Sequence, residues 1–80
     1  MITVRLQYFS QLRDQKGPDT LTLASGSTVA ALLEGLYADL PALKNWDQCL
    51  LVAVGTEYVP REHVLKPDDL VSLMPPVQGG

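Results

Sequence analysis

The sequence predicts an α+β domain in which one main helix packs across one face of a sheet of about five strands. Apolar and polar residues alternate at the start of the chain, as in a half-buried strand, and a middle stretch repeats its apolar residues at helical spacing. Short apolar segments separated by turn-forming residues follow that stretch. The expected order is therefore two strands, one helix and three strands.

The first strand is expected over residues 2–8, where apolar and polar side chains alternate. The next residue, Phe9, falls on the outward side of this strand. Residues 13–19 are polar and contain a Gly-Pro pair, which predicts a turn. A second short strand then runs through Leu21 and Leu23.

The helix is expected to begin after a hydroxyl N-cap at Ser27 or Thr28 and to end near Leu40, because the following proline disfavours helical geometry. Gly35 within it costs about 1 kcal/mol relative to alanine. A looser link over residues 41–47 leads back to the sheet. One stripe of the helix is apolar and consists of Val29, Leu32, Leu33, Leu36, Tyr37 and Leu40.

Three further strands complete the sheet. Residues 50–54 are continuously apolar and short enough for a buried strand, and a turn at Gly55 connects them to residues 57–59. The last strand covers residues 70–74. Its inward residues are expected to be Val71 and Leu73, and its outward residues Ser72 and Met74.

Length and composition fit one domain over residues 1–80, of which 46% are hydrophobic and 19% charged. One cysteine and one histidine give no recognisable metal-ligand set, and the cysteine has no partner for an intramolecular disulfide. A net charge of −3 with scattered basic residues disfavours nucleic acid as a partner. No stretch has the features of a signal peptide or a membrane span, so we expect a cytoplasmic protein.

The tail, residues 75–80, differs in composition from the rest of the chain. Pro75 and Pro76 remove two backbone donors, so the last strand should stop and a flexible, extended tail should leave the sheet. Gly79 and Gly80 lack side chains and can pass along a narrow channel to present an α-carboxylate at another protein's active site. Adenylation by ATP would make that carboxylate a mixed anhydride, which a sulfur nucleophile can open to a thiocarboxylate. A frayed terminus is the alternative interpretation.

These motifs resemble the small subunit of molybdopterin synthase, a MoaD-like sulfur carrier with the ubiquitin-like β-grasp fold and a mixed sheet. The resemblance spans nearly the whole chain, and its last motif is the most specific. Two turns depart from the family pattern: Gly55 stands where asparagine is frequent, and residues 67–69 replace an acidic-Gly-Asp turn. The matching segments are Tyr8 to Asp14, Thr28-Val29, Ala53-Val54 and Pro75-Pro76-Val77-Gln78-Gly79-Gly80.

The resemblance implies a sulfur carrier and not a free-standing enzyme. Gly80 would be adenylated by a ubiquitin-activating-like enzyme that uses ATP, and a sulfur donor protein would supply the sulfur of the thiocarboxylate. The large subunit of molybdopterin synthase would carry the catalytic side chains, while this chain binds no cofactor or metal. Sulfur would pass to cyclic pyranopterin monophosphate to form the dithiolene of molybdopterin. Two copies of each subunit would form a heterotetramer.

Three apolar residues are expected to contact the large subunit: Phe9, Tyr58 and Met74. They stand at outward or strand-edge positions, where exposed apolar side chains commonly mark an interface.

Other residues are weaker candidates for chemistry. Cys49 adjoins an apolar strand and is expected to be a small core residue and not a reactive thiol. His63 should be structural or solvated, and Asp68 and Asp69 fit a turn with local hydrogen bonds. The open functional alternatives are a sulfur carrier for thiamine thiazole or another pathway, a ubiquitin-like protein modifier, and a binding module whose glycines are incidental.

Overall fold

A computed structural model describes residues 1–9, 12–13 and 17–75 of the chain. Its elements follow the expected order of two strands, one α-helix and three strands. The structure adds a 3₁₀ helix in place of the looser link. The elements are β1 (Ile2–Tyr8), β2 (Thr20–Leu23), α1 (Val29–Asp39), η2 (Pro41–Trp46), β3 (Leu51–Val54), β4 (Glu57–Tyr58) and β5 (Leu70–Met74).

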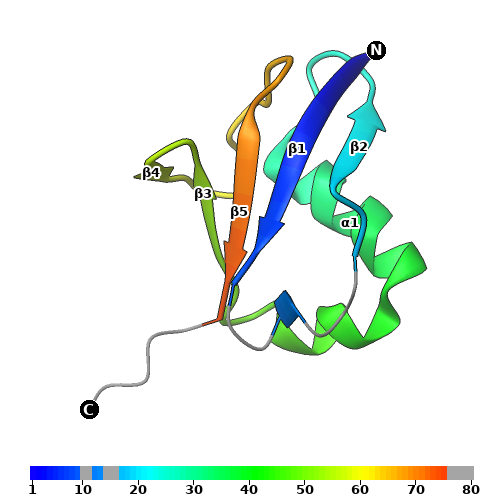
Figure 1. The fold of residues 1–80 in the computed structure, drawn as a ribbon, viewed down its shortest axis with the longest axis vertical. Coiled ribbons are helices and arrows are strands. Elements are labelled where there is room, and N and C mark those ends of the chain that lie inside the picture. Colours follow the sequence, from blue (N-terminus) through cyan, green and yellow to red (C-terminus); the bar gives the residue numbers. More distant parts are fainter. Residues whose placement is uncertain (10–11, 14–16, 76–80) are drawn as a thin grey trace.

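The five strands form one mixed sheet in the order β2-β1-β5-β3-β4 (Figure 1). β5 lies in the centre, parallel to β1 and antiparallel to β3. A parallel pair needs a crossover, and the connection between β1 and β5 includes α1, which lies across one face of the sheet (Figure 1). The predicted fold class, a mixed sheet of five strands with one main helix on one face, is confirmed.

Helix α1 begins at the expected cap. The Thr28 side chain accepts a hydrogen bond from the Ala31 backbone N–H at 3.3 Å, which satisfies one otherwise unpaired amide of the first turn. Val29 and Ala30 donate their N–H groups to carbonyls of the loop that follows β4. The apolar stripe faces the sheet, and its four most buried residues are Val29, Leu32, Leu33 and Leu36.

The core lies between α1 and the sheet. The inward residues of β1 and β5 are buried there, as the alternating pattern predicts. Leu43 is fully buried and Trp46 is partly buried against the same core, which explains why residues 41–46 form an ordered 3₁₀ helix. The buried strand residues of this core include Ile2, Val4, Leu6, Val52, Val71 and Leu73.

Left-handed backbone occurs in both turns where the sequence departs from the family pattern. Gly55 has φ 64°, so the turn between β3 and β4 uses the conformational freedom expected of it. Asp68, in the turn before β5, has φ 67° without being a glycine. This is the turn in which the sequence departs from the family's acidic-Gly-Asp pattern, and aspartate is among the few residues that tolerate this conformation.

The prediction that Cys49 belongs to the core is wrong. Cys49 is exposed and lies in the turn between η2 and β3, where its thiol donates to the Trp46 carbonyl at 3.4 Å. The neighbouring Leu50 is buried in its place. An apolar run shows that a strand is near, but the turn before it decides which side chain turns inward.

Candidate functional site

The face of the sheet opposite α1 carries the residues expected to dock a partner. Because paired residues share a face, the register places the side chains of Ala53, Ser72 and Tyr58 on this face. Leu51 and Met74 form another pair on it. In the described part of the chain, no helix covers this face.

A shallow hollow of about 200 Å³ lies on this open face. Phe9 is 40% exposed and Tyr58 is 68% exposed, whereas Met74 is half-buried. These three residues come from separate segments of the chain, and the fold brings them to one site. We call the lining residues the open-face patch: Phe9, Ala53, Gly55, Thr56, Tyr58, Ser72 and Met74.

The chemistry of the open-face patch suits protein association. Its lining includes aromatic and aliphatic side chains and two hydroxyls, and none of its described members is charged. Covering such a surface releases water from apolar groups without desolvating an ion. Ser72 points to this face as expected but is itself buried, and its hydroxyl lies 3.4 Å from the Gln7 side-chain oxygen.

The patch is continuous with the start of the tail. Met74 is the last residue of β5, and half-buried Pro75 follows it outside regular structure. The other tail residues predicted to matter, Pro76, Gly79 and Gly80, lie outside the described residues. A partner that covers the patch would therefore also stand next to the point where the tail begins.

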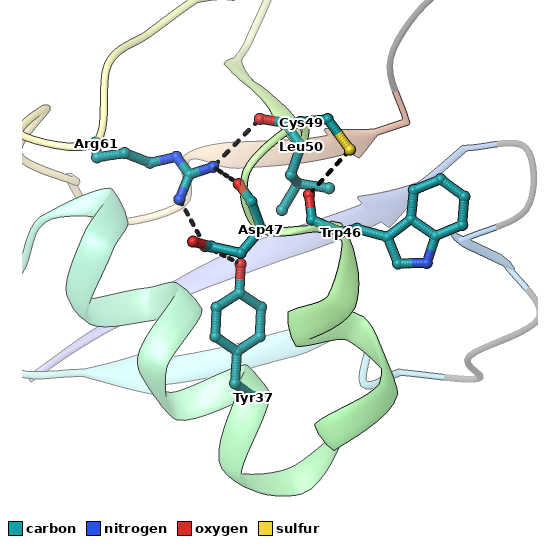
Figure 2. A network of polar contacts seen from close by, with 6 residues as sticks. All are labelled: Tyr37, Trp46, Asp47, Cys49, Leu50 and Arg61. Carbon is teal, nitrogen blue, oxygen red and sulfur yellow. Dashed lines mark hydrogen bonds and ion pairs between the residues drawn. The ribbon is translucent and has the colours of Figure 1, made fainter.

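A polar network joins three elements on the helix side of the molecule (Figure 2). The Tyr37 hydroxyl of α1 donates to Asp47 Oδ1 at 2.6 Å, and Arg61 Nη1 donates to the same oxygen at 3.0 Å. Arg61 Nη2 also donates to the Asp47 carbonyl at 2.7 Å and to the Leu50 carbonyl at 3.3 Å. The guanidinium thus ties the loop after β4 to the segment that leads into β3.

Protonation in this network follows from its hydrogen bonds. The bond from Tyr37, with that from Arg61, lowers the pKa of the Asp47 carboxyl. Burial and the bond to Asp47 raise the pKa of the Tyr37 phenol well above its usual range. At neutral pH the network is therefore a carboxylate that accepts from a neutral phenol and a guanidinium.

A second hollow, of about 530 Å³, lies beside this network, but its chemistry does not indicate a ligand. Two of its lining groups, Asp47 and Arg61, form an ion pair at 3.0 Å and satisfy each other. No group of three or more His, Cys, Asp or Glu side chains in residues 1–9, 12–13 and 17–75 could hold a metal ion. Within the same residues, no helix is long and apolar enough to cross a membrane.

A comparison with models of known protein families identifies the family of this chain. The model of the ThiS family matches residues 6–80, from within β1 through the tail. The chain belongs to the ThiS family. Its five-stranded sheet with one crossing helix is the fold that this ThiS-family chain shares with known ubiquitin-like carriers, so the resemblance to MoaD-like carriers is confirmed.

Two curated relatives align with almost the whole ThiS-family chain. The molybdopterin synthase sulfur carrier subunit of Arabidopsis thaliana is 30% identical over 81 residues, which cover 99% of this chain and 84% of the relative. The protein of the same name in Chlamydomonas reinhardtii is 32% identical over 81 residues, 96% of this chain and 98% of the relative. Both relatives are named as carrier subunits, which agrees with the expectation of a carrier and not of a catalytic subunit.

Solved structures support the fold. A candidate molybdopterin converting factor subunit 1 from Pyrococcus furiosus superimposes with a TM-score of 0.84 at 28% identity, covering 96% of this chain and all of that one (100%). The small archaeal modifier protein 1 of Haloferax volcanii superimposes with a TM-score of 0.81 at 22% identity, covering 96% of this chain and 100% of that one. The second likeness shows the fold alone.

The remaining sequence candidates have structural roles in the described residues. His63 is half-buried, and its carbonyl accepts from Val29 N–H at 2.9 Å. Asp69 Oδ2 accepts from Lys66 N–H at 2.8 Å, which is the local turn bond expected of it. The network around Arg61 was not predicted from the sequence. Asp47 is 10 residues from Tyr37 and 14 from Arg61, and no spacing rule joins residues at these separations.

Proposed function

We propose that this ThiS-family chain is the sulfur carrier subunit of a molybdopterin synthase, with the Gly80 carboxylate as its working group. The observation that carries the proposal is the alignment, over nearly the whole chain, with two relatives named as sulfur carrier subunits of that synthase. The family match extends through residue 80 and so includes the Gly79-Gly80 motif.

The proposed cycle begins with activation. An adenylating enzyme joins the Gly80 carboxylate to AMP from ATP and releases pyrophosphate. The terminal sulfur of a persulfide on a donor protein then attacks the acyl carbon and displaces AMP, which gives an acyl disulfide. A thiol supplies the two electrons that cleave this disulfide, and Gly80 is released as a thiocarboxylate. Each thiocarboxylate transfers one sulfur to cyclic pyranopterin monophosphate, and water hydrolyses the bond to Gly80 and returns it as a carboxylate. Two such transfers supply the two sulfurs of the dithiolene.

The folded domain serves as the handle in this cycle. The open-face patch docks the large subunit, and the tail leads from β5 toward that subunit's active site. Gly80 lies six residues after Met74, so an extended tail reaches at most about 22 Å from the patch. The open-face patch and the Gly80 carboxylate can therefore engage one partner at the same time.

The proposed partners follow from these steps. The large subunit supplies the catalytic side chains and, with two copies of each subunit, forms a heterotetramer. The adenylating enzyme binds ATP, while this chain itself needs no cofactor. The proposed setting is the cytoplasm, which supplies ATP and keeps the exposed thiol of Cys49 reduced.

The test follows Gly80 through activation. Wild-type protein, incubated with the adenylating enzyme and ATP, should release pyrophosphate and, with a sulfur source, gain the mass expected when sulfur replaces one oxygen. Deleting Gly80 moves the carboxylate back by about 3.3 to 3.6 Å, which a near-attack geometry does not tolerate. A C-terminal tag converts the group to an amide. Thiocarboxylate formation at the wild-type rate by either variant would overturn the proposal.

A second variant tests the passage of the tail. In Gly79→Val a β-branched side chain narrows the accessible φ and ψ and adds bulk where the proposal requires a slender chain. This variant should unfold at the wild-type temperature yet fail in sulfur transfer with the large subunit. Wild-type turnover by Gly79→Val would refute the narrow-channel part of the proposal.

The family match also favours a second candidate, a carrier for thiamine thiazole or another sulfur pathway, and the fold is shared with a protein modifier. Activation of Gly80 would be common to all of these. The partner that co-purifies with the chain from its native host separates them. A chain that no activating enzyme adenylates would instead be a binding module.

A further inference from the structure

Tyr58 is the most exposed aromatic residue of the open-face patch, and it lies on the shortest strand of the sheet. β4 contains two residues, Glu57 and Tyr58, and pairs only with β3. Beyond that pairing, the Val59 N–H donates to the Val52 carbonyl at 3.0 Å. An edge strand this short has little cooperative support of its own, so residues outside the ladder must hold the Tyr58 backbone in place.

Arg61 connects the two ends of the β3–β4 hairpin. It stands three residues after Tyr58, and its guanidinium donates to the carbonyl of Leu50, the residue that precedes β3. The same group bonds both the side chain and the carbonyl of Asp47, which Tyr37 holds from α1 (Figure 2). The Arg61 carbonyl also accepts from Ala30 N–H at 2.9 Å. The chain is therefore anchored immediately before and after the hairpin.

We propose that Arg61 is a positioning residue for the open-face patch, and that it fixes Tyr58 for docking without touching the partner. The proposal rests on the docking role proposed above. Arg61 lines the hollow beside α1, so the sheet lies between it and the patch on the opposite face. Its planar fork reaches three oxygen atoms at once, an arrangement that lysine and glutamine do not reproduce.

The experiment is a double-mutant cycle on affinity for the purified large subunit. Arg61→Gln should weaken binding by about tenfold, and Tyr58→Ala should weaken it more. In the Tyr58→Ala background, Arg61→Gln should cost less than twofold, because the side chain that it positions is absent. A merely stabilising role would lower the unfolding temperature but would not produce this dependence on Tyr58.

Hydrogen exchange provides a second measurement, in the free protein. Arg61→Gln should speed exchange of the Val59 amide, which bonds to the Val52 carbonyl, more than exchange in the central strand β5. Glu62→Gln is the matched control, since Glu62 is exposed and adjacent in sequence, and it should change neither exchange nor affinity. Arg61→Lys should fall between wild type and Arg61→Gln.

The outcomes are distinguishable. If wild type binds the large subunit and Arg61→Gln binds equally well, or if its effects add to those of Tyr58→Ala, the positioning role is wrong while the proposed function stands. Unchanged exchange of the Val59 amide would also overturn the positioning role. If wild type does not bind the large subunit, the proposed function fails and the positioning role of Arg61 fails with it.

Discussion

Replacing Tyr58 by alanine should weaken binding to the large subunit by about thirtyfold. Tyr58 is 68% exposed in the free chain, and a tyrosine buries roughly 200 Å² when fully covered, so a partner can remove about 140 Å² from water. At about 25 cal/mol per Å² this sets a ceiling near 3.5 kcal/mol. Alanine keeps its Cβ and the ring edge stays partly wet, so we expect about 2 kcal/mol, or thirtyfold in Kd.

Calorimetric titration of purified large subunit into wild type and Tyr58→Ala measures this loss. Val64→Ala is the matched control, because Val64 is an apolar residue that is 49% exposed but pairs with Thr28 next to the start of α1, away from the patch. Val64→Ala should bind like wild type. Since Tyr58 is already largely solvated in the free chain, its removal should leave the unfolding temperature nearly unchanged. A folded Tyr58→Ala variant that binds within twofold of wild type would refute the assignment of the patch.

Three further predictions concern stability. Gly35→Ala should raise the free energy of unfolding by about 1 kcal/mol in a urea titration, because Gly35 is a helical residue whose added Cβ would meet nothing within 4 Å. Asp68→Gly should raise it by about 1 kcal/mol, because Asp68 holds φ 67° and glycine adopts that conformation without steric cost. The hydrogen bonds from Tyr37 and Arg61 lower the pKa of Asp47 in the folded state. The Asp47 carboxylate therefore contributes its full stabilisation above the unfolded-state pKa of about 4, and this stabilisation is lost as pH falls through the lower folded-state pKa. The stability difference between wild type and Asp47→Asn should therefore be constant above about pH 5 and should shrink as the solution is acidified below about pH 4.

Each stability prediction has an outcome that contradicts it. A Gly35→Ala variant no more stable than wild type would show that helix propensity at this position does not limit the stability of the fold. If Asp68→Gly has a lower free energy of unfolding than wild type, the aspartate side chain stabilises the fold by more than the left-handed backbone at this position costs. A pH-independent difference for Asp47→Asn would show that the carboxylate charge does not stabilise the fold.

Local patterns were sufficient for the five strands and the α-helix, but not for the 3₁₀ helix η2. The period of the apolar residues identifies α1 and its buried stripe, because a helix of 3.6 residues per turn needs its apolar side chains at those spacings to cover a sheet. The alternation from Ile2 to Tyr8 likewise indicates which face of β1 is buried. Such patterns arise within one element, so the sequence alone reveals them. The Gly-Gly motif and its proposed chemistry are also features of the sequence alone.

The tertiary structure decided what these elements build together. Phe9, Tyr58 and Met74 are far apart in sequence, and they meet because β5 inserts between β1 and β3, a strand order that no local pattern contains. The outward orientation of Cys49 and the network around Arg61 likewise depend on how the segment after α1 meets the loop after β4. Hydrogen bonds between distant side chains follow from packing, and the same local periodicity is compatible with many packings. The sequence by itself therefore determined the strands, the α-helix and the candidate reacting group, whereas the 3₁₀ helix, the docking surface and the residue that positions it required the fold.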